Sequence, residues 1–519
     1  MKRVIIPALL LLATVIEAVP QKGVDYRAEV SAHGSSGIFA PYYMTANRYG
    51  VVANGSGAYA RAGAFIRMDS TRRFSYAAGI DLIGNYETAS PVRQFQNGQW
   101  TTRYVHPDYF VIQQLYADVK YRAVFLSVGI KERDNESPIT DRQYSSGGLV
   151  LSGNSRPIPQ IEAGFHRFVD IPFTKGWLQI KGNIAYGKFL DSNYLRNHYY
   201  YYSSFLTTGV YYHYKSVFFR TNPHQPFVFT IGIEDGVQFG GTKTTYRDGK
   251  IASIEHSPAN FKAFLQAFLP GAGDESTSMG DQLYVYGNHV GSIDMALQYN
   301  FHDHSRLKLY TQWLYEDGSG MGKLNGWDGL WGLSYHKEGK HIITDAVIEY
   351  LDLMNQSGAI PWEPNDRPGT PVTSRVSGGD DYYNNFFFNG WQHYGFGLGT
   401  PMSPSIMYNT NGYLRFLYTR VRGIHLAIGG FFDDEWQYRL MASYRTSLGT
   451  PFIPARSTYH QGAMLIECSY TPKKLKNWSF CGAVAVDAGN MTGDNVGVSI
   501  SIVKSGSLFR FKKNDTSNK

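Results

Sequence analysis

Hydrophobic and polar side chains alternate with a period of two along much of the chain. In Ser292–Phe301, Ile293 and every second residue after it are apolar or aromatic, and the intervening residues are small, polar or acidic. The pattern recurs in Arg306–Tyr315, Phe227–Glu234, Trp177–Tyr186 and Leu414–Arg420. A period of two is typical of a strand with one apolar and one polar face. Counting such runs predicts about 18 antiparallel strands between Tyr26 and Val503.

Alternation alone fits both a soluble β-sandwich and a membrane β-barrel. The connections favour the barrel, because short ones at 120–122, 302–305 and 420–423 contrast with long ones at 87–110, 131–157, 188–225, 241–288 and 353–411. Tyr and Trp also recur near strand ends, where a membrane interface favours them. Short turns at one end and long loops at the other are typical of outer-membrane barrels. The predicted fold class is therefore an all-β membrane protein.

The N-terminus supports export. Lys2 and Arg3 precede the apolar run Val4–Ile16, and Ala18 provides a small residue for cleavage. This layout predicts a signal peptide at 1–18, followed by one barrel domain at 19–519. Later apolar runs fall short of the roughly 20 residues that a membrane-spanning helix needs. We therefore expect a monomeric barrel surrounded by outer-membrane lipid.

Two short segments have helical character. Phe261, Phe264, Leu265 and Phe268 recur at i, i+3, i+4 and i+7, and Pro270 with Gly271 ends the run. This predicts a helix near 259–269, and a second candidate spans 195–206. Helices in barrel loops are expected to cap or narrow the lumen, so short helical and loop elements should form a plug.

Composition and charge exclude other classes. Aromatic residues make up 15% of the chain and charged residues only 18%, the reverse of a disordered composition. The net charge of +7 comes without a clustered basic stripe, so nucleic acid is not an expected partner. Cys468 and Cys481 flank one hairpin turn, but strand parity turns Cys468 outward and Cys481 inward, which predicts two free thiols.

Catalytic and metal-binding spacings are missing from the sequence. It has no GxSxG, HExxH, P-loop or CxxC motif. His302, Asp303 and His304 lie in a tight turn, where solvated side chains are the simpler interpretation. An outer-membrane hydrolase that brings Ser, His and an acid together in space is not excluded, but no motif favours it. We therefore expect no enzyme activity, no cofactor and no metal.

Three irregular segments carry a family resemblance. They are SSGGLVLSGNSRPIPQIEAGF (145–165), NHVGSIDMAL (288–297) and YYNNFFFNGWQHYGFGLGTP (382–401). In this order they resemble the capsule assembly protein Wzi family, and the resemblance covers most of the mature chain. It implies an outer-membrane barrel of about 18 strands, closed by helices and loops. It also implies a lectin-like, non-enzymatic anchor that holds exported capsular polysaccharide at the cell surface. The helical bundle that such proteins carry near the N-terminus has no counterpart here, because residues 25–60 read as strand and loop.

The third segment supplies the candidate sugar-binding site. Sugar rings have apolar faces edged by hydroxyls, so aromatic rings beside amide and imidazole groups suit them. The candidates are Trp391, Gln392, His393, Tyr394, Asn385 and Arg156. Arg156 would meet a carboxylate of an acidic polymer or pair with an acid of the lumen. The competing interpretation is that these aromatics pack a plug, and the competing function is a substrate-specific porin.

Overall fold

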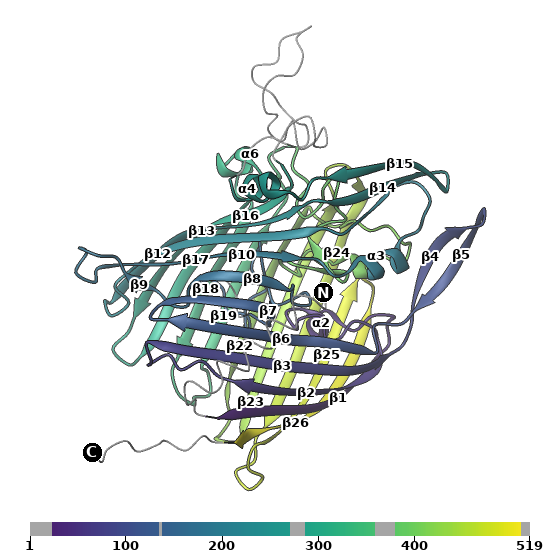
Figure 1. The fold of residues 1–519 in the computed structure, drawn as a ribbon. Helices are drawn as coiled ribbons and strands as arrows, with labels where there is room; N and C mark the ends of the chain where they lie inside the picture. The colour runs from purple at the N-terminus through teal and green to yellow at the C-terminus, as the bar shows by residue number, and fades with distance from the viewer. Residues whose placement is uncertain (1–22, 134–136, 270–285, 359–378, 510–519) are drawn as a thin grey trace.

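The computed structural model describes residues 23–133, 137–269, 286–358 and 379–509. The predicted signal peptide at 1–18 lies outside this part of the chain. The described residues form one antiparallel β-barrel with long excursions at one end (Figure 1).

The wall of the barrel closes on itself. β1 (Val24–Ser35) pairs with β2 (Gly57–Ile66) on one side and with β26 (Asn495–Phe509) on the other. The sheet holds 19 strand segments, and β8 and β9 both pair with β10 as parts of one strand, which leaves 18 wall strands. The predicted fold class is confirmed.

The other wall strands are β3 (Phe74–Glu87), β6 (Phe110–Tyr121), β7 (Val124–Ile130), β8 (Gln160–Phe165), β9 (Val169–Asp170), β10 (Leu178–Lys188), β12 (Tyr211–Thr221), β13 (Phe227–Phe239), β16 (Asn288–Asn300), β17 (Ser305–Tyr315), β18 (Gly329–Lys337), β19 (Asp345–Asp352), β22 (Val421–Phe431), β23 (Trp436–Gly449), β24 (Pro454–Tyr470) and β25 (Trp478–Gly489).

The alternating pattern sorts side chains between lumen and exterior as predicted. On β16, Ser292 and Asp294 are buried against polar groups of the lumen, whereas Leu297 is exposed on the outer face. On β24 and β25, Cys468 lies opposite Gly482 and Cys481 lies opposite Ser469. The two thiols therefore point to opposite faces, and both are free.

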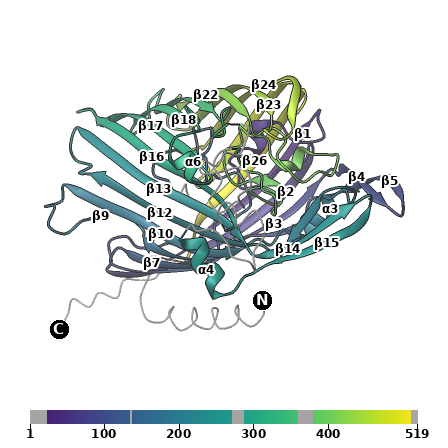
Figure 2. The ribbon, with the colours of Figure 1, turned by 90° about the horizontal axis from the view of Figure 1, so that it is seen from above.

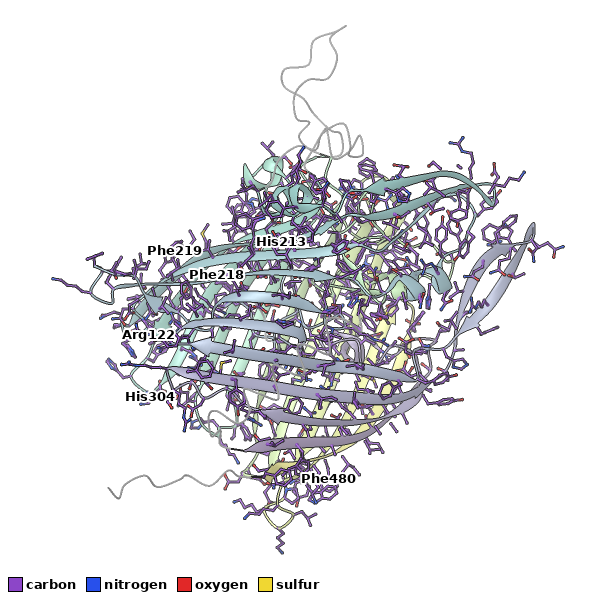
Figure 3. All side chains as sticks on the ribbon, viewed as in Figure 1. Arg122, His213, Phe218, Phe219, His304 and Phe480 are labelled. Atoms are coloured by element: carbon purple, nitrogen blue, oxygen red, sulfur yellow. The ribbon has the colours of Figure 1, made fainter. Side chains whose placement is uncertain are left out.

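The two ends of the barrel differ. Short turns lie at one end, hereafter the turn end, where Figure 3 labels Arg122 and His304 at the left. The long connections lie at the other end, hereafter the loop end. The stretch 188–225, read from the sequence as one connection, contains the wall strand β12. The described residues 353–358 and 379–420 therefore lie at the loop end with the other long segments.

Some excursions extend beyond the wall at the loop end. Figures 1 and 2 show two of them, the hairpin of β4 (Ser90–Gln96) and β5 (Gln99–Val105) and the pair β14 (Gly241–Arg247) and β15 (Lys250–Ser257). β11 (Phe205–Thr208) adds to the second pair. None of the helices among the described residues is long and apolar enough to cross a membrane.

Other loop segments fold into the lumen and form what we term the plug: residues 36–56 with α2 (Tyr42–Thr45), residues 137–159, and residues 379–420 with β20 (Gln392–His393), β21 (Phe396–Gly397) and the 3-10 turn η1 (Ile406–Tyr408). Wall side chains accept hydrogen bonds from plug backbone. The Tyr42 amide donates to Asp487 of β25 (2.8 Å), and the Ser146 amide donates to Glu349 of β19 (2.6 Å). Irregular backbone at membrane depth needs such partners.

Two local expectations need correction. Leu414–Arg420 is not a wall strand but part of the plug, and β22 begins at Val421, inside the expected turn at 420–423. The candidate helix at 195–206 overlaps α3 (Ser192–His198) only at its start, since 199–204 is irregular and β11 follows. The other candidate contains α4 (Phe261–Phe268).

Candidate functional site

Trp391 lies in the interior of the plug. Its side chain is 0% exposed, and its Nε1–H donates to the carbonyl of Val150 over 2.7 Å. A Cβ built on Gly236 of β13 would stand 2.5 Å from the indole, so the missing side chain at Gly236 makes room for the ring. The side chain has no surface left for a sugar, so the packing interpretation describes Trp391.

Gln392 and His393 are also buried, and they hold neighbouring residues in place. Gln392 Nε2 donates to Asp191 Oδ2 (2.8 Å), and Leu190 N–H donates to His393 Nε2 (3.3 Å). The proton of the imidazole is therefore on Nδ1, which lies 2.9 Å from the Arg156 carbonyl. Burial lowers the pKa of His393 to about 4, so the ring is neutral at pH 7, and it raises the pKa of Asp191 to about 6.

Asn385 shapes the plug backbone. Its Oδ1 accepts from the Phe387 amide (2.8 Å), and its Nδ2 donates to Asn288 of β16 (3.3 Å). Asn385, Gln392, His393 and Trp391 thus all act within the plug. Tyr394 and Arg156 remain as the candidates that reach an open surface.

Tyr394 stands at the tip of a tight hairpin. β20 and β21 are joined by Tyr394 and Gly395, whose φ values of 54° and 82° are those of a type I′ turn. A side chain at residue 395 would meet the Tyr194 hydroxyl at 2.0 Å, so glycine is required there. Tyrosine is an unusual choice at a positive φ, and such strain is often kept where a side chain has a function. The turn presents the Tyr394 ring toward the loop end.

A pocket of about 170 Å³, hereafter the rim pocket, opens beside Tyr394. Arg156 Cζ stands 4.6 Å above the Tyr394 ring, and Arg156 Nη1 lies 2.7 Å from Asp108 Oδ2. Next to Tyr394, whose ring centroid is 6.3 Å from that of Tyr194, Tyr194 and His198 of α3 stack with centroids 3.9 Å apart. Five loops converge here, and the remaining lining includes Phe39, Asn54, His106, Asn193, Asn197 and Phe396.

The polar groups of the rim pocket differ in exposure. The Asp108 side chain is 58% exposed, whereas that of Arg156 is 12% exposed. Burial lowers the pKa of His198 to about 4, so this ring is neutral at pH 7 and stacks as an uncharged aromatic. The pocket thus combines aromatic faces with amide groups and one opposed charge pair.

Sequence reasoning missed Asp108, Tyr194 and His198. They lie in VHPDYF and SNYLRNHYYYY, long-loop stretches with aromatic rings beside Asn, His or Asp. The same mixture of aromatic rings with Asn and His marked residues 382–401 as a candidate segment. The contact between these loops depends on tertiary structure, which spacing along the chain does not show.

The lumen on the turn side of the plug holds a polar cavity of about 430 Å³. Arg48 of the plug and Arg439 of β23 share Glu467 of β24, at 2.6 and 2.8 Å. This arrangement ties α2 and the loop around it to the wall. Across the described residues, no three His, Cys, Asp or Glu side chains are grouped as metal ligands.

Comparison with known proteins supports the architecture. No family model and no curated protein matches the sequence. Among solved structures, the chain is similar to Wzi, described as an outer membrane protein involved in group 1 capsule assembly in Escherichia coli and a carbohydrate-binding β-barrel. The TM-score is 0.53 at 12% identity, over 96% of this chain and 88% of Wzi. The protein is an outer-membrane β-barrel.

Other outer-membrane barrels match less closely. Acinetobacter baumannii OccAB4 gives a TM-score of 0.44 at 10% identity, over 94% of this chain and 98% of that one. Pseudomonas aeruginosa OprD gives 0.40 at 8%, over 94% and 95%. At 12% identity the likeness to Wzi shows the fold alone. Outer-membrane barrels in general carry their long loops on the extracellular side, so we expect the rim pocket at the loop end to face the cell exterior.

Proposed function

We propose that this protein binds an exported polysaccharide at the cell surface and assists the assembly and attachment of a capsule, without catalysis. The observation that carries the proposal is the rim pocket, an aromatic and amide-lined cavity at the loop end of a barrel whose lumen holds a plug. The likeness in fold to a carbohydrate-binding barrel supports it.

The chemistry of the rim pocket suits a sugar unit. Tyr394, one face of which Arg156 covers, contributes aromatic surface together with Tyr194 and His198 for the apolar side of a pyranose, and Asn193 and Asn197 offer amide groups to its hydroxyls. Asp108 accepts hydrogen bonds from vicinal hydroxyls, and Arg156 holds it in position. The modest cavity fits one or two units of a long chain, so affinity for the polymer comes from repeated engagement.

The decisive variant is Tyr394→Asn. Asn tolerates positive φ and is favoured in type I′ turns, so the barrel and the hairpin should remain folded while the ring is lost. We expect weaker binding of purified polymer by roughly fivefold, from about 1 kcal/mol of lost aromatic contact. The matched control is Tyr104→Asn, an exposed tyrosine on β5 outside the pocket.

Cells test the wider proposal. Deleting the gene should leave polymer export intact and release more polymer into the medium, and Tyr394→Asn should reproduce part of that release. Retention of the polymer in the deletion strain, with loss of uptake of a specific solute, would favour the substrate-specific porin instead. Liposomes with the purified protein should resist solute-driven swelling, because the plug bonds to strands around the lumen.

A further inference from the structure

The amphipathic helix α4 lies against the outer surface of the barrel wall. Phe264 packs on Phe239 of β13 and on Tyr211 of β12, with ring centroids 5.1 and 6.0 Å apart. The neighbouring strand residues point the other way, since Gln238 donates to the plug carbonyl of Gly390 (3.0 Å). Because successive residues of a strand face opposite sides, α4 lies outside the lumen. Figure 1 shows it above β13 and β16, and the expectation that this helix caps the lumen is wrong.

Beneath α4 the outer wall carries charged groups. Asp235 of β13 lies 2.7 Å from Lys215 Nζ of β12 and 3.0 Å from His289 Nδ1 of β16. Lys215 also donates to the Ala267 carbonyl of α4 (3.3 Å). Charged side chains on the lipid face of a barrel cost about 2–4 kcal/mol at the midplane and less near the interface. The helix covers this ion cluster on the side where lipid would lie.

The outward face of α4 is apolar apart from Lys262, which is exposed. Ala263 and Ala267 are fully buried against the wall, whereas Phe261, Leu265 and Phe268 are 77%, 49% and 36% exposed, and Leu269 just after the helix is 67% exposed. A surface with so many large apolar side chains is unfavourable in water. It continues the apolar outer face of β13, where Phe229 and Ile231 are exposed.

The height of α4 on the wall matches the edge of the membrane. The Phe227 and Tyr299 rings, 4.8 Å apart, mark the aromatic belt near the turn end. Val237, which packs in the cluster with α4, follows ten residues later on β13. At about 3.3 Å per residue and a tilt of about 40°, that span rises about 25 Å, the height of the apolar band. The helix therefore lies where acyl chains meet headgroups on the loop side.

We propose that α4 is a lipid-anchoring helix. It lies in the plane of the outer leaflet, with Phe261, Leu265, Phe268 and Leu269 among the acyl chains, and it separates the Lys215–Asp235–His289 cluster from hydrocarbon. Interfacial helices with one apolar face bind membranes in this manner. The anchor acts independently of sugar binding, and it fixes the height at which the loop end emerges from the membrane.

A depth probe tests the proposal directly. In the full chain with Cys468→Ala and Cys481→Ala, Leu265→Cys is labelled with an environment-sensitive fluorophore and reconstituted into phosphatidylcholine bilayers. We expect strong quenching by lipids brominated on the acyl chain and weak quenching by aqueous iodide. The matched control, Ile254→Cys on β15, should show the reverse. Equal iodide quenching at both positions would overturn the proposal, as would crosslinking of residue 265 between two copies.

A stability comparison covers the case in which the label disturbs the helix. Phe261→Ser with Leu265→Ser removes exposed apolar groups only, so heat-modifiability in detergent should be unchanged. In bilayers the unfolding midpoint should fall below that of the unsubstituted chain, whereas Ile251→Ser with Ile254→Ser should leave it unchanged. An equal fall of the unfolding midpoint in detergent and in bilayers, or an unchanged midpoint in both, would contradict a lipid contact.

Discussion

Replacing Trp391 with alanine should loosen the plug without removing the rim pocket. The indole is fully buried against Gly236 of the wall, and it donates one hydrogen bond to Val150. Truncating a buried Trp typically costs about 3–5 kcal/mol through lost packing and a residual cavity. Each 1.4 kcal/mol changes an equilibrium tenfold, so local opening of the plug should become about two to nearly four orders of magnitude more frequent.

Amide hydrogen exchange is the suitable assay, because it reports local opening while the barrel stays closed. The reporters are the amides of Trp391 and Leu398, which bond to the carbonyls of Tyr383 (2.7 Å) and Trp391 (3.0 Å). Trp391→Phe is the matched control. It keeps most of the ring but leaves the buried Val150 carbonyl without its donor, at about 1–3 kcal/mol. Unchanged exchange in Trp391→Ala, together with lost polymer binding, would refute plug packing and restore direct sugar contact.

Three further expectations follow from the same contacts. Gly236→Ala places a Cβ 2.5 Å from the indole of Trp391 and should destabilise the plug by about 1–3 kcal/mol. The control Gly482→Ala, whose Cβ would have nothing within 4 Å, should leave stability unchanged. Equal amide exchange rates in the two variants would contradict this expectation. Because the folded pKa of His393 is about 4 against 6.5 ordinarily, the stability from its neutral ring is present above pH 6.5 and lost as the pH falls through 4. His393→Gln should flatten that dependence in exchange rates corrected for intrinsic pH effects, and an unchanged slope would exclude this residue as the cause. In bilayers a water-soluble maleimide should reach Cys481, which lines the lumen cavity, but not Cys468 on the outer face, and the denatured, non-reduced chain should show two thiols.

The wall was predictable from sequence because each strand obeys one simple rule. Lipid on one side and polar partners on the other impose a period of two, as in Ser292–Phe301. The plug follows no such rule, and the segment Leu414–Arg420 shows how an alternating pattern can mislead. Asn384 accepts from the Phe416 amide (2.9 Å) and donates to its carbonyl (2.9 Å), so one side chain replaces a neighbouring strand. The segment does alternate between apolar and polar residues, but its hydrogen-bond partners are plug residues and not a neighbouring wall strand.

The candidate site was predictable in composition and not in position. A run of rings and amides at 382–401 indicated a special segment, but Trp391, Gln392 and His393 became its buried support. Of the six candidate residues, only Tyr394 and the distant Arg156 line the rim pocket, because contacts among loops decide which side of a segment is covered. Helical periodicity likewise revealed α4 but not the side of the wall on which it lies.

The inward-facing acids of the wall explain why a polar lumen need not conduct. Alternation predicts Asp294, Glu349 and Asp487 on the lumen face, which in an open barrel would be hydrated. Here each has a partner: Ser137 and Gln312 donate to Asp294, Ser145 and Ser146 donate to Glu349, and the Tyr42 amide donates to Asp487. The plug substitutes for the water of a channel.

This reasoning has an electrical consequence. If Trp391→Ala opens the plug, the freed carboxylates of Asp294, Glu349 and Asp487 would line the new path. Arg445, whose guanidinium lies 4.1 Å from the Tyr42 ring, and Lys308 of β17, which donates to the Ile139 carbonyl of the plug, supply opposing charges, and the three acids outnumber them. We expect brief openings in planar bilayers that favour potassium over chloride, measured as a shifted reversal potential in a salt gradient. Adding Glu349→Gln should reduce that preference, whereas Tyr394→Asn should give no openings. Anion preference in Trp391→Ala would show that the path avoids these acids and follows the arginines of the lumen cavity instead.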